Sequence, residues 1–338
     1  MGAAEAMVDL TMRFLPARFA LAGLFFAACV TSLCMGTSVG TIIALMPIAA
    51  GLAERTEMTL PIVAAAVVGG AFFGDNLSFI SDTTIVSTQS QGCKLSDKFR
   101  FNIRMVLPVA IIAGLIYIFL GSEATEVVAP QTIPFWKVIP YLTVLVCAAI
   151  GMNVLVVLVI ANLLTCITGI IGGSYDFMGW ITSTLDGVMG MSELILISML
   201  AGGIFAMISH NKGMDFIIER ITSRVKHRWG AELSICMLVA FANICTANNT
   251  IAILSVGDIS RRISERFGID PRRSASLLDT TSCCVQGLLP YGAQLLMASG
   301  LAGISAMSIV PYLYYPALLG IAVLATIFIL HKRNYSKQ

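Results

Sequence analysis

The sequence predicts an all-α polytopic membrane protein that contains two inverted repeats with paired broken helices. Only 12% of its 338 residues are charged and its mean hydropathy is +0.87, whereas a soluble globular protein carries about 25% charged residues. Whole stretches of 18 to 51 residues contain no Asp, Glu, Lys or Arg. At about 20 residues per crossing, these stretches hold roughly eight to ten membrane segments.

The uncharged stretches set the order of the membrane segments along the chain. They cover residues 19–53, 105–122, 138–175, 194–211, 233–257 and 280–330. Basic residues, Lys98 among them, gather in short polar segments that the positive-inside rule places in the cytoplasm, at 94–104, 220–228, 261–273 and 332–337. Between Gly121 and Trp136 the charges are Glu123 and Glu126 alone, which suits an external loop over 122–137. We therefore expect a multi-pass protein of the cell inner (plasma) membrane.

Small and polar residues interrupt four of the apolar stretches in mid-span, at 36–40, 74–84, 246–250 and 279–290. In hydrocarbon every backbone N–H and C=O must be paired, so unwound backbone survives only where protein or a wet cavity covers it. A single break is equally well explained by a kink or a close helix contact. The set as a whole indicates a transport pathway, because its acids cost about 2.5–3.5 kcal/mol each to insert. Residues that mark the breaks themselves are Gly36, Thr37, Ser38, Gly40 and Pro290.

Residues 1–121 and 138–338 follow one pattern twice. Thr41–Leu45 matches Thr250–Leu254, and an amphipathic segment starting near Ala6 matches one near Gly213, at offsets of 207 to 209 residues. Further along, Asp75 falls against Asp279 at an offset of 204, although Asp279–Thr281 also repeats Asp82–Thr84 literally, and both alignments stay open. Paired discontinuous helices in two repeats point to a secondary transporter with its binding site near the midplane. The alternative is a duplicated membrane scaffold without transport.

The two copies are unequal at their starts. About three helices' worth of apolar sequence, residues 138–211, precedes the second amphipathic segment, whereas nothing precedes the first. We expect Met1 to be an internal start, with roughly 70 to 140 residues in two or three spans missing before it. The helices between 138 and 211 should then have no symmetry mate.

The densest polar run combines two acids with hydroxyls and an amide. Asp75 and Asp82 are seven residues apart, and the run also holds Asn76, Ser78, Ser81 and Thr83. Carboxylate, hydroxyl, amide and unwound carbonyl oxygens are the ligands that a hard cation such as sodium prefers. A proton and a cation then compete for one acid, and exchange results if only the occupied forms cross the membrane.

The second repeat would supply the opposing wall of this site, with Asp279, Thr280, Asn248 and Asn249. For each acid the alternative is a structural ion pair or an interfacial position.

Other classes of protein lack their signatures. The 21 basic residues are nearly balanced by 19 acidic ones, which excludes an electrostatic nucleic-acid binder. Nine cysteines and three histidines show no metal-site spacing, so we expect no cofactor and no metal beyond a transported ion. The glycines of 36–41 lack the lysine of a phosphate-binding loop. An intramembrane aspartyl protease is disfavoured because Tyr175-Asp176 has no Gly-x-Gly-Asp partner.

The run from Gly74 to Thr84, followed by Phe99–Asn102 and Pro108, resembles the NhaC-type sodium/proton antiporter family. In the second half, Asp279–Thr281 and Leu288–Gly292 look like the matching acid and proline-aromatic element of that family. The resemblance runs from about Gly36 to Ala302 and implies an inverted-repeat transporter. Better-known members carry a lysine after Gly-Asp where this chain has Asn76, which removes a candidate charge partner for Asp75.

The resemblance implies a secondary active transporter, not an enzyme, that exchanges Na⁺ for H⁺ at a midplane Asp site. Li⁺ is a further candidate ion. The alternative is a sodium-coupled carrier or antiporter of small carboxylates of the malate and lactate type, although no arginine lies within the breaks to clamp a carboxylate. The lipid bilayer is the expected surroundings, and the sequence leaves the oligomeric state open, a homodimer included.

Overall fold

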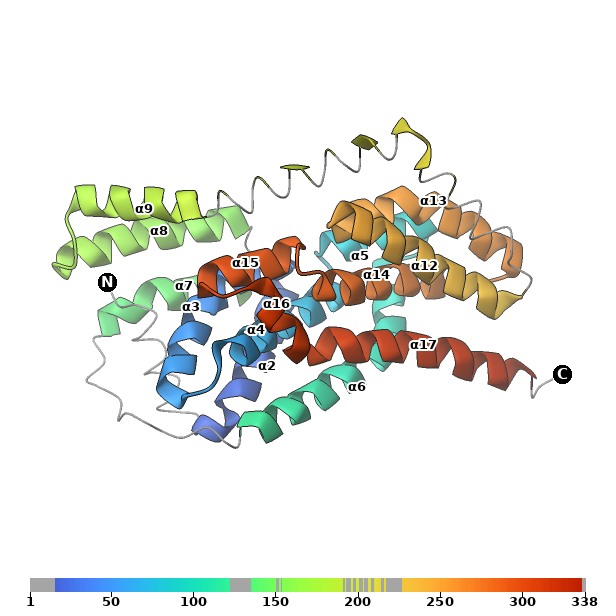
Figure 1. Cartoon of the computed structure of the whole chain (residues 1–338), viewed down its shortest axis with the longest axis horizontal. Helices are drawn as coiled ribbons and strands as arrows, with labels where there is room; N and C mark the ends of the chain where they lie inside the picture. Colours follow the sequence, from blue (N-terminus) through green and yellow to red (C-terminus); the bar gives the residue numbers. More distant parts are fainter. Residues whose placement is uncertain are drawn as a thin grey trace.

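A computed structural model of the chain is shown in Figure 1. It describes residues 16–121, 135–149, 154–190 and 227–335, together with scattered positions between 152 and 216. Every regular element in these ranges is a helix. The expected loop 122–137 and both amphipathic segments lie mostly outside the described residues.

Five helices in the described ranges are long and apolar enough to cross a membrane, or up to six if a bent pair near the C-terminus counts as one span. Two shorter apolar helices add to them. The chain is thus an all-α polytopic membrane protein. The expected total of eight to ten segments includes residues 191–226, which are described only in part.

Two series of four helices share the same order and the same lengths. The first is α2 (Ala17–Met35), α3 (Ser38–Thr56), α4 (Leu60–Leu77) and α5 (Asp82–Gln91), and the second is α12 (Arg228–Thr246), α13 (Asn249–Phe267), α14 (Pro271–Leu288) and α15 (Ala293–Ala302). Each helix of the second series begins and ends 211 residues after its counterpart, as from Ser38 to Asn249 and from Asp82 to Ala293. The series continue into α6 (Leu95–Gly121) and into α16 (Ala306–Ile309), η1 (Val310–Tyr312) and α17 (Tyr314–Tyr335).

This register corrects the alignments that the sequence suggested. At an offset of 211 the counterpart of Asp75 is Gln286, not Asp279. Hydrogen bonds at equivalent places support it: Ser32 Oγ on α2 donates to the carbonyl of Ala71 on α4 over 2.6 Å, and Asn243 Nδ2 on α12 donates to the carbonyl of Ser282 on α14 over 2.9 Å.

The same local chemistry breaks the chain at equivalent points of both series. α2 is capped at its C-terminal end by Gly36 and α12 by Ala247, both with left-handed backbone (φ 67° and 50°). The N-cap of α3 is Thr37, whose hydroxyl accepts from Gly40 N–H, and the N-cap of α13 is Asn248, whose side-chain Oδ1 accepts from Ile251 N–H. A left-handed residue followed by a side-chain N-cap stops one helix and starts the next at an angle.

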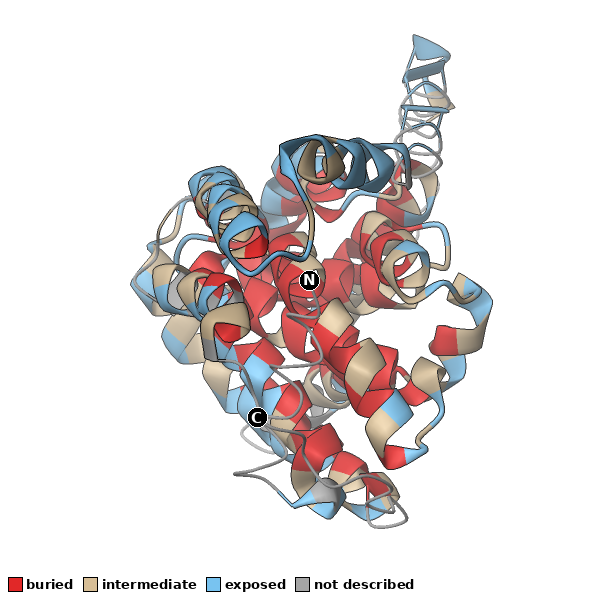
Figure 2. Ribbon diagram, turned by 90° about the vertical axis from the view of Figure 1, so that its left-hand side faces the viewer, coloured by how far each residue is buried: buried red, intermediate tan, exposed pale blue. Residues whose placement is uncertain are grey.

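The centre of the bundle is tightly packed and buried, with exposed residues on the outside (Figure 2). α4 lies close against α2, because a Cβ at Gly70 or Gly74 would collide with the α2 backbone. This spacing of small residues is typical of membrane helix contacts. On the outer side of α6, Ile111, Leu115 and Phe119 are exposed in successive turns, which suits a lipid-facing surface.

Within the described ranges, three more helices lie between α6 and the second series. α7 (Phe135–Ala149) packs on α2 and α8 (Val154–Ile171), and α8 runs beside α9 (Phe177–Gly190) at one end of the molecule (Figure 1). Trp180 Nε1 on α9 donates to Asn162 Oδ1 on α8 over 2.8 Å.

Candidate functional site

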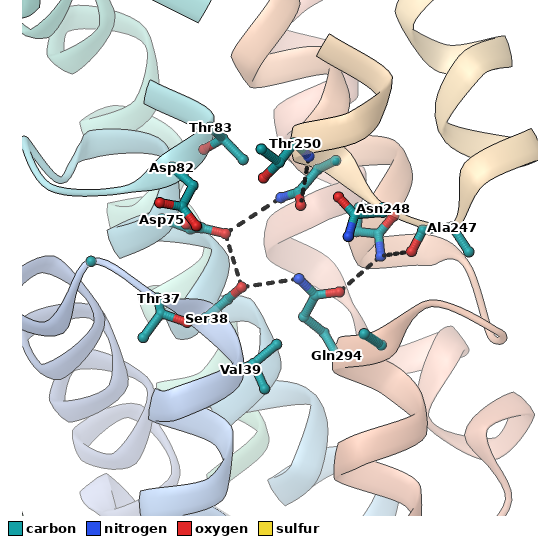
Figure 3. Close-up of a pocket in the computed structure, with 14 residues that line it drawn as sticks. Thr37, Ser38, Val39, Asp75, Asp82, Thr83, Ala247, Asn248, Thr250 and Gln294 are labelled. Carbon is teal, nitrogen blue, oxygen red and sulfur yellow. Dashed lines mark hydrogen bonds between the residues drawn. The ribbon is translucent and has the colours of Figure 1, made fainter. Parts of the chain in front are cut away.

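A cavity of about 160 Å³ lies where the broken segments of the two series meet (Figure 3). Its size leaves room for several water molecules. The lining residues are Gly36, Thr37, Ser38, Val39, Asp75, Asp82, Thr83, Ala247, Asn248, Asn249, Thr250, Gln286, Ala293 and Gln294.

Four helices begin at this cavity. Their first residues, Ser38 of α3, Asp82 of α5, Asn249 of α13 and Ala293 of α15, all line it. Because a helix start carries a partial positive charge, the four starts favour negative charge between them. The acids in the lining, Asp75 and Asp82, supply that charge.

Asp75 lies in the last turn of α4 and is 5% exposed. Its Oδ1 accepts from Ser81 Oγ over 2.5 Å, and its Oδ2 accepts from Ser38 Oγ over 2.8 Å and from Asn249 Nδ2 over 3.4 Å. All three donors are neutral, and no ion pair to Asp75 occurs in the described part of the chain. A buried carboxylate with neutral partners alone can bind a small cation or a proton.

Asp82 differs from Asp75 in its surroundings. It is exposed at the start of α5, where the helix dipole stabilises its carboxylate. The two acids therefore lie at different depths of one cavity.

Asp279 does not line the cavity. It is fully buried on α14 and pairs with Lys98 of α6, which is 1% exposed. Lys98 Nζ also donates to the carbonyl of Asn76 over 2.7 Å and to Thr84 Oγ1 over 2.9 Å. The sequence placed Lys98 only in a short basic segment, whereas the structure buries it against Asp279. For Asp279 the structure favours the structural ion pair, one of the alternatives to a cation site.

Polar side chains behind the cavity connect the end of α4 to neighbouring helices. Asn102 of α6 donates to Asn76 Oδ1 and accepts from Thr280 Oγ1 over 3.0 Å. Ser78 Oγ donates to the carbonyl of Leu33 over 2.8 Å. These contacts hold α4, α6 and α14 together, which fixes the end of α4 that carries Asp75.

The structure thus divides the residues that the sequence singled out. Those that line the cavity are Gly36, Thr37, Ser38, Asp75, Asp82, Thr83, Asn248 and Asn249, and those that do not are Gly40, Asn76, Ser78, Ser81, Asp279, Thr280 and Pro290. Ser81 nonetheless contacts Asp75 directly. Sequence reasoning missed Lys98, Gln286 and Gln294. The correct repeat register would have indicated Gln286.

Within the described residues, no group of three or more His, Cys, Asp or Glu side chains could hold a metal ion. The cavity instead offers one buried carboxylate with hydroxyl and amide groups. Such a set suits a weakly held, exchangeable monovalent cation more than a resident transition metal.

Several known proteins are similar to this chain along most of its length. The sequence model of the Na⁺/H⁺ antiporter family matches residues 1–122 and 123–332. A malate-2H⁺/Na⁺-lactate antiporter of Bacillus subtilis is 22% identical over 335 residues, covering 88% of this chain and 70% of that protein. The NhaC Na⁺/H⁺ antiporter of Alkalihalophilus pseudofirmus is 23% identical over 314 residues, covering 82% and 66%. An uncharacterised Na⁺/H⁺ antiporter of Haemophilus influenzae is 22% identical, covering 85% and 69%.

Proposed function

Because the chain belongs to the Na⁺/H⁺ antiporter family, of the NhaC type, we propose that it is a secondary transporter of the cell membrane that exchanges Na⁺ for H⁺ at the cavity around Asp75. One observation carries the assignment of the site: Asp75 is the buried acid of this cavity and has neutral hydrogen-bond partners. Asp279, by contrast, is already compensated by Lys98.

The exchange follows from competition for one carboxylate. A proton on Asp75 removes the charge that attracts Na⁺, and bound Na⁺ disfavours the proton. The hydroxyls of Ser38 and Ser81 donate hydrogen bonds to Asp75 and can rotate. When a cation binds, these hydroxyls can turn away from the carboxylate and present their oxygens to the cation. Empty, charged Asp75 is costly to move through the membrane, which favours crossing in the occupied forms.

The helix series α2–α5 and α12–α15 are proposed to be inverted copies that enclose the cavity near the midplane. Residues from both series line it, and their equivalent breaks at Gly36 and Ala247 both lie in its wall. Relative movement of the two series would open the cavity to one side of the membrane at a time. The remaining acid, Asp82, lies in the same wall and would attract cations toward Asp75.

A carboxylate carrier is the second candidate, favoured by the four helix starts at the cavity and by the malate/lactate relative. Neither lysine nor arginine is among the residues that line the cavity. Without a basic side chain in the lining, a small carboxylate would lie opposite Asp75 with only helix starts and neutral groups to compensate its charge.

Transport in proteoliposomes tests both candidates. The purified protein is reconstituted with a pH-sensitive dye inside, and Na⁺, Li⁺, K⁺, malate or lactate is added outside. We expect Na⁺ to drive protons out of the lumen without any malate or lactate, and K⁺ to have no effect. Proton movement that requires malate or lactate would favour the carboxylate carrier, and no ion-dependent movement at all would contradict the proposal.

A further inference from the structure

Gln286 occupies the position in the second helix series that Asp75 occupies in the first. Both side chains are in the last turn of their helix, two residues before its end, on α14 and α4. Both line the same cavity, and Gln286 is 1% exposed. The cavity therefore has a carboxylate on one wall and a neutral amide at the equivalent point of the other.

A chain of hydrogen bonds between the two series fixes how this amide is turned (Figure 3). Ionised Asp75 can only accept, so Ser38 Oγ donates to it over 2.8 Å and must itself accept from Gln294 Nε2, over 3.0 Å. Gln294 Oε1 then accepts from Gln286 Nε2 over 2.9 Å, and the second proton of Gln286 Nε2 goes to the carbonyl of Ala247 over 2.8 Å. A flipped Gln286 amide would set its oxygen against two other oxygens.

This orientation leaves Gln286 Oε1 without a hydrogen-bond donor. Six buried side-chain polar atoms in the described residues lack a partner, and this oxygen is the one among them that belongs to a cavity-lining residue. Leaving a buried acceptor unpaired costs about 1–3 kcal/mol, which a cation that contacts this oxygen would recover. If Gln286 served only to hydrogen-bond the carbonyl of Ala247, it would need its Nε2 group but no unpaired oxygen.

We propose that Gln286 Oε1 is a neutral oxygen ligand of the transported cation, the second-series counterpart of Asp75. This inference rests on the proposed function. A free carbonyl oxygen attracts a hard monovalent cation and repels a carboxylate anion, so it also selects between the two substrate classes. One charged and one neutral ligand at the equivalent positions match a single positive charge, whereas two acids there would repel each other.

Replacement of the amide tests the ligand role. Gln286→Met keeps the length of the side chain and removes both polar groups. We expect its apparent Na⁺ affinity to weaken by about 10- to 100-fold, as for the loss of one hydrogen bond or ligand contact to a charge. Gln286→Leu removes the same polar groups with a shorter side chain, so its Na⁺ affinity should weaken to a similar extent.

Gln91 of α5 is the matched control. It is a buried amide outside the cavity, with Nε2 donating to the carbonyl of Gly257 over 2.8 Å and Oε1 accepting from Ser274 Oγ over 2.8 Å. Gln91→Met should lose thermal stability without a change in Na⁺ affinity, because it breaks hydrogen bonds and touches no ligand.

The readout is the rise in melting temperature of purified protein as Na⁺ is added, together with the Na⁺ concentration for half-maximal proton flux in proteoliposomes. Wild-type Na⁺ affinity in Gln286→Met overturns the inference while the proposed function stands. If Gln286→Met does not fold, wild-type Na⁺ affinity in Gln286→Leu overturns it instead. A wild-type protein that neither binds Na⁺ nor moves protons overturns the proposed function and the inference with it.

Discussion

Asn in place of Asp75 removes one negative charge and changes little else in shape. The carboxylate accepts hydrogen bonds from Ser81, Ser38 and Asn249, at 2.5, 2.8 and 3.4 Å. A unit charge 4 Å from a cation contributes about 4 kcal/mol where the effective dielectric constant is about 20, which is close to three orders of magnitude in affinity. We therefore expect the Na⁺ affinity of Asp75→Asn to fall by about 10³-fold.

The assay is Na⁺-driven proton efflux from proteoliposomes, with Na⁺ varied over four decades. Asp82→Asn and Asp258→Asn are the comparisons, because both acids are exposed and Asp258 lies outside the cavity. Water screens an exposed charge, so Asp82→Asn should weaken the Na⁺ affinity by less than about tenfold and Asp258→Asn should leave the affinity unchanged. Wild-type Na⁺ affinity in Asp75→Asn would refute the reasoning, provided that the variant purifies as a folded protein.

Three further predictions concern the ion pair, a helix end and pH. Lys98→Met should lower stability by about 3–5 kcal/mol because it leaves the charge of Asp279 buried and unpaired, and the double variant Lys98→Met/Asp279→Leu should recover most of the lost stability. Melting temperatures in detergent measure both changes. Arg261→Ala, at an exposed ion pair, is the control and should be nearly neutral. Gly36→Ala should lower stability by at least about 1–2 kcal/mol, because a left-handed φ of 67° is strained for alanine. Gly230→Ala, with open space around the added Cβ, should not destabilise the protein. Equal melting temperatures of the two variants would contradict this reasoning. Each drop of one pH unit should weaken apparent Na⁺ affinity by up to tenfold in the range where a proton occupies Asp75, because that proton must be released before Na⁺ binds. An apparent Na⁺ affinity that stays the same from pH 6 to pH 9 would rule out direct competition.

The helix breaks at Gly36 and at Asn248 could be predicted from the sequence, whereas the breaks expected over 74–84 and 279–290 begin too early, because α4 continues to Leu77 and α14 to Leu288. Gly36 tolerates left-handed backbone and the Thr37 side chain caps the next helix, and Asn248 caps α13 in the same way. That chemistry is local, so a few neighbouring residues contain it. The acid at position 75 was likewise visible, because a charge inside an apolar stretch stands out.

The partners of the buried charges could not be predicted in the same way. Lys98 belongs to a short polar segment with several other basic residues, and such lysines usually reach water. Its partner Asp279 is 181 residues away along the chain, so only tertiary packing brings the two together. The same limit explains why Asp279 was expected at the cavity and is found behind it.

The register of the repeat was wrong for a related reason. Short identical runs such as Thr-Ile at positions 41 and 250 align at 209 residues, but the helix ends align at 211. Helix caps are the better guide, because Thr37 and Asn248 serve the same purpose with different side chains. Identity matching cannot recognise that equivalence, and so Gln286 was overlooked.

Proton release on Na⁺ binding is the most direct test of the claim that one carboxylate, Asp75, binds Na⁺ and H⁺ in alternation. Purified protein in weakly buffered detergent solution is mixed with NaCl or with KCl, and the pH is followed. At a pH where Asp75 is protonated, we expect NaCl to release about one proton per Na⁺ bound, KCl to release none, and Asp75→Asn to release none with either salt. Na⁺ binding without proton release, or equal release from Asp75→Asn, would contradict the account.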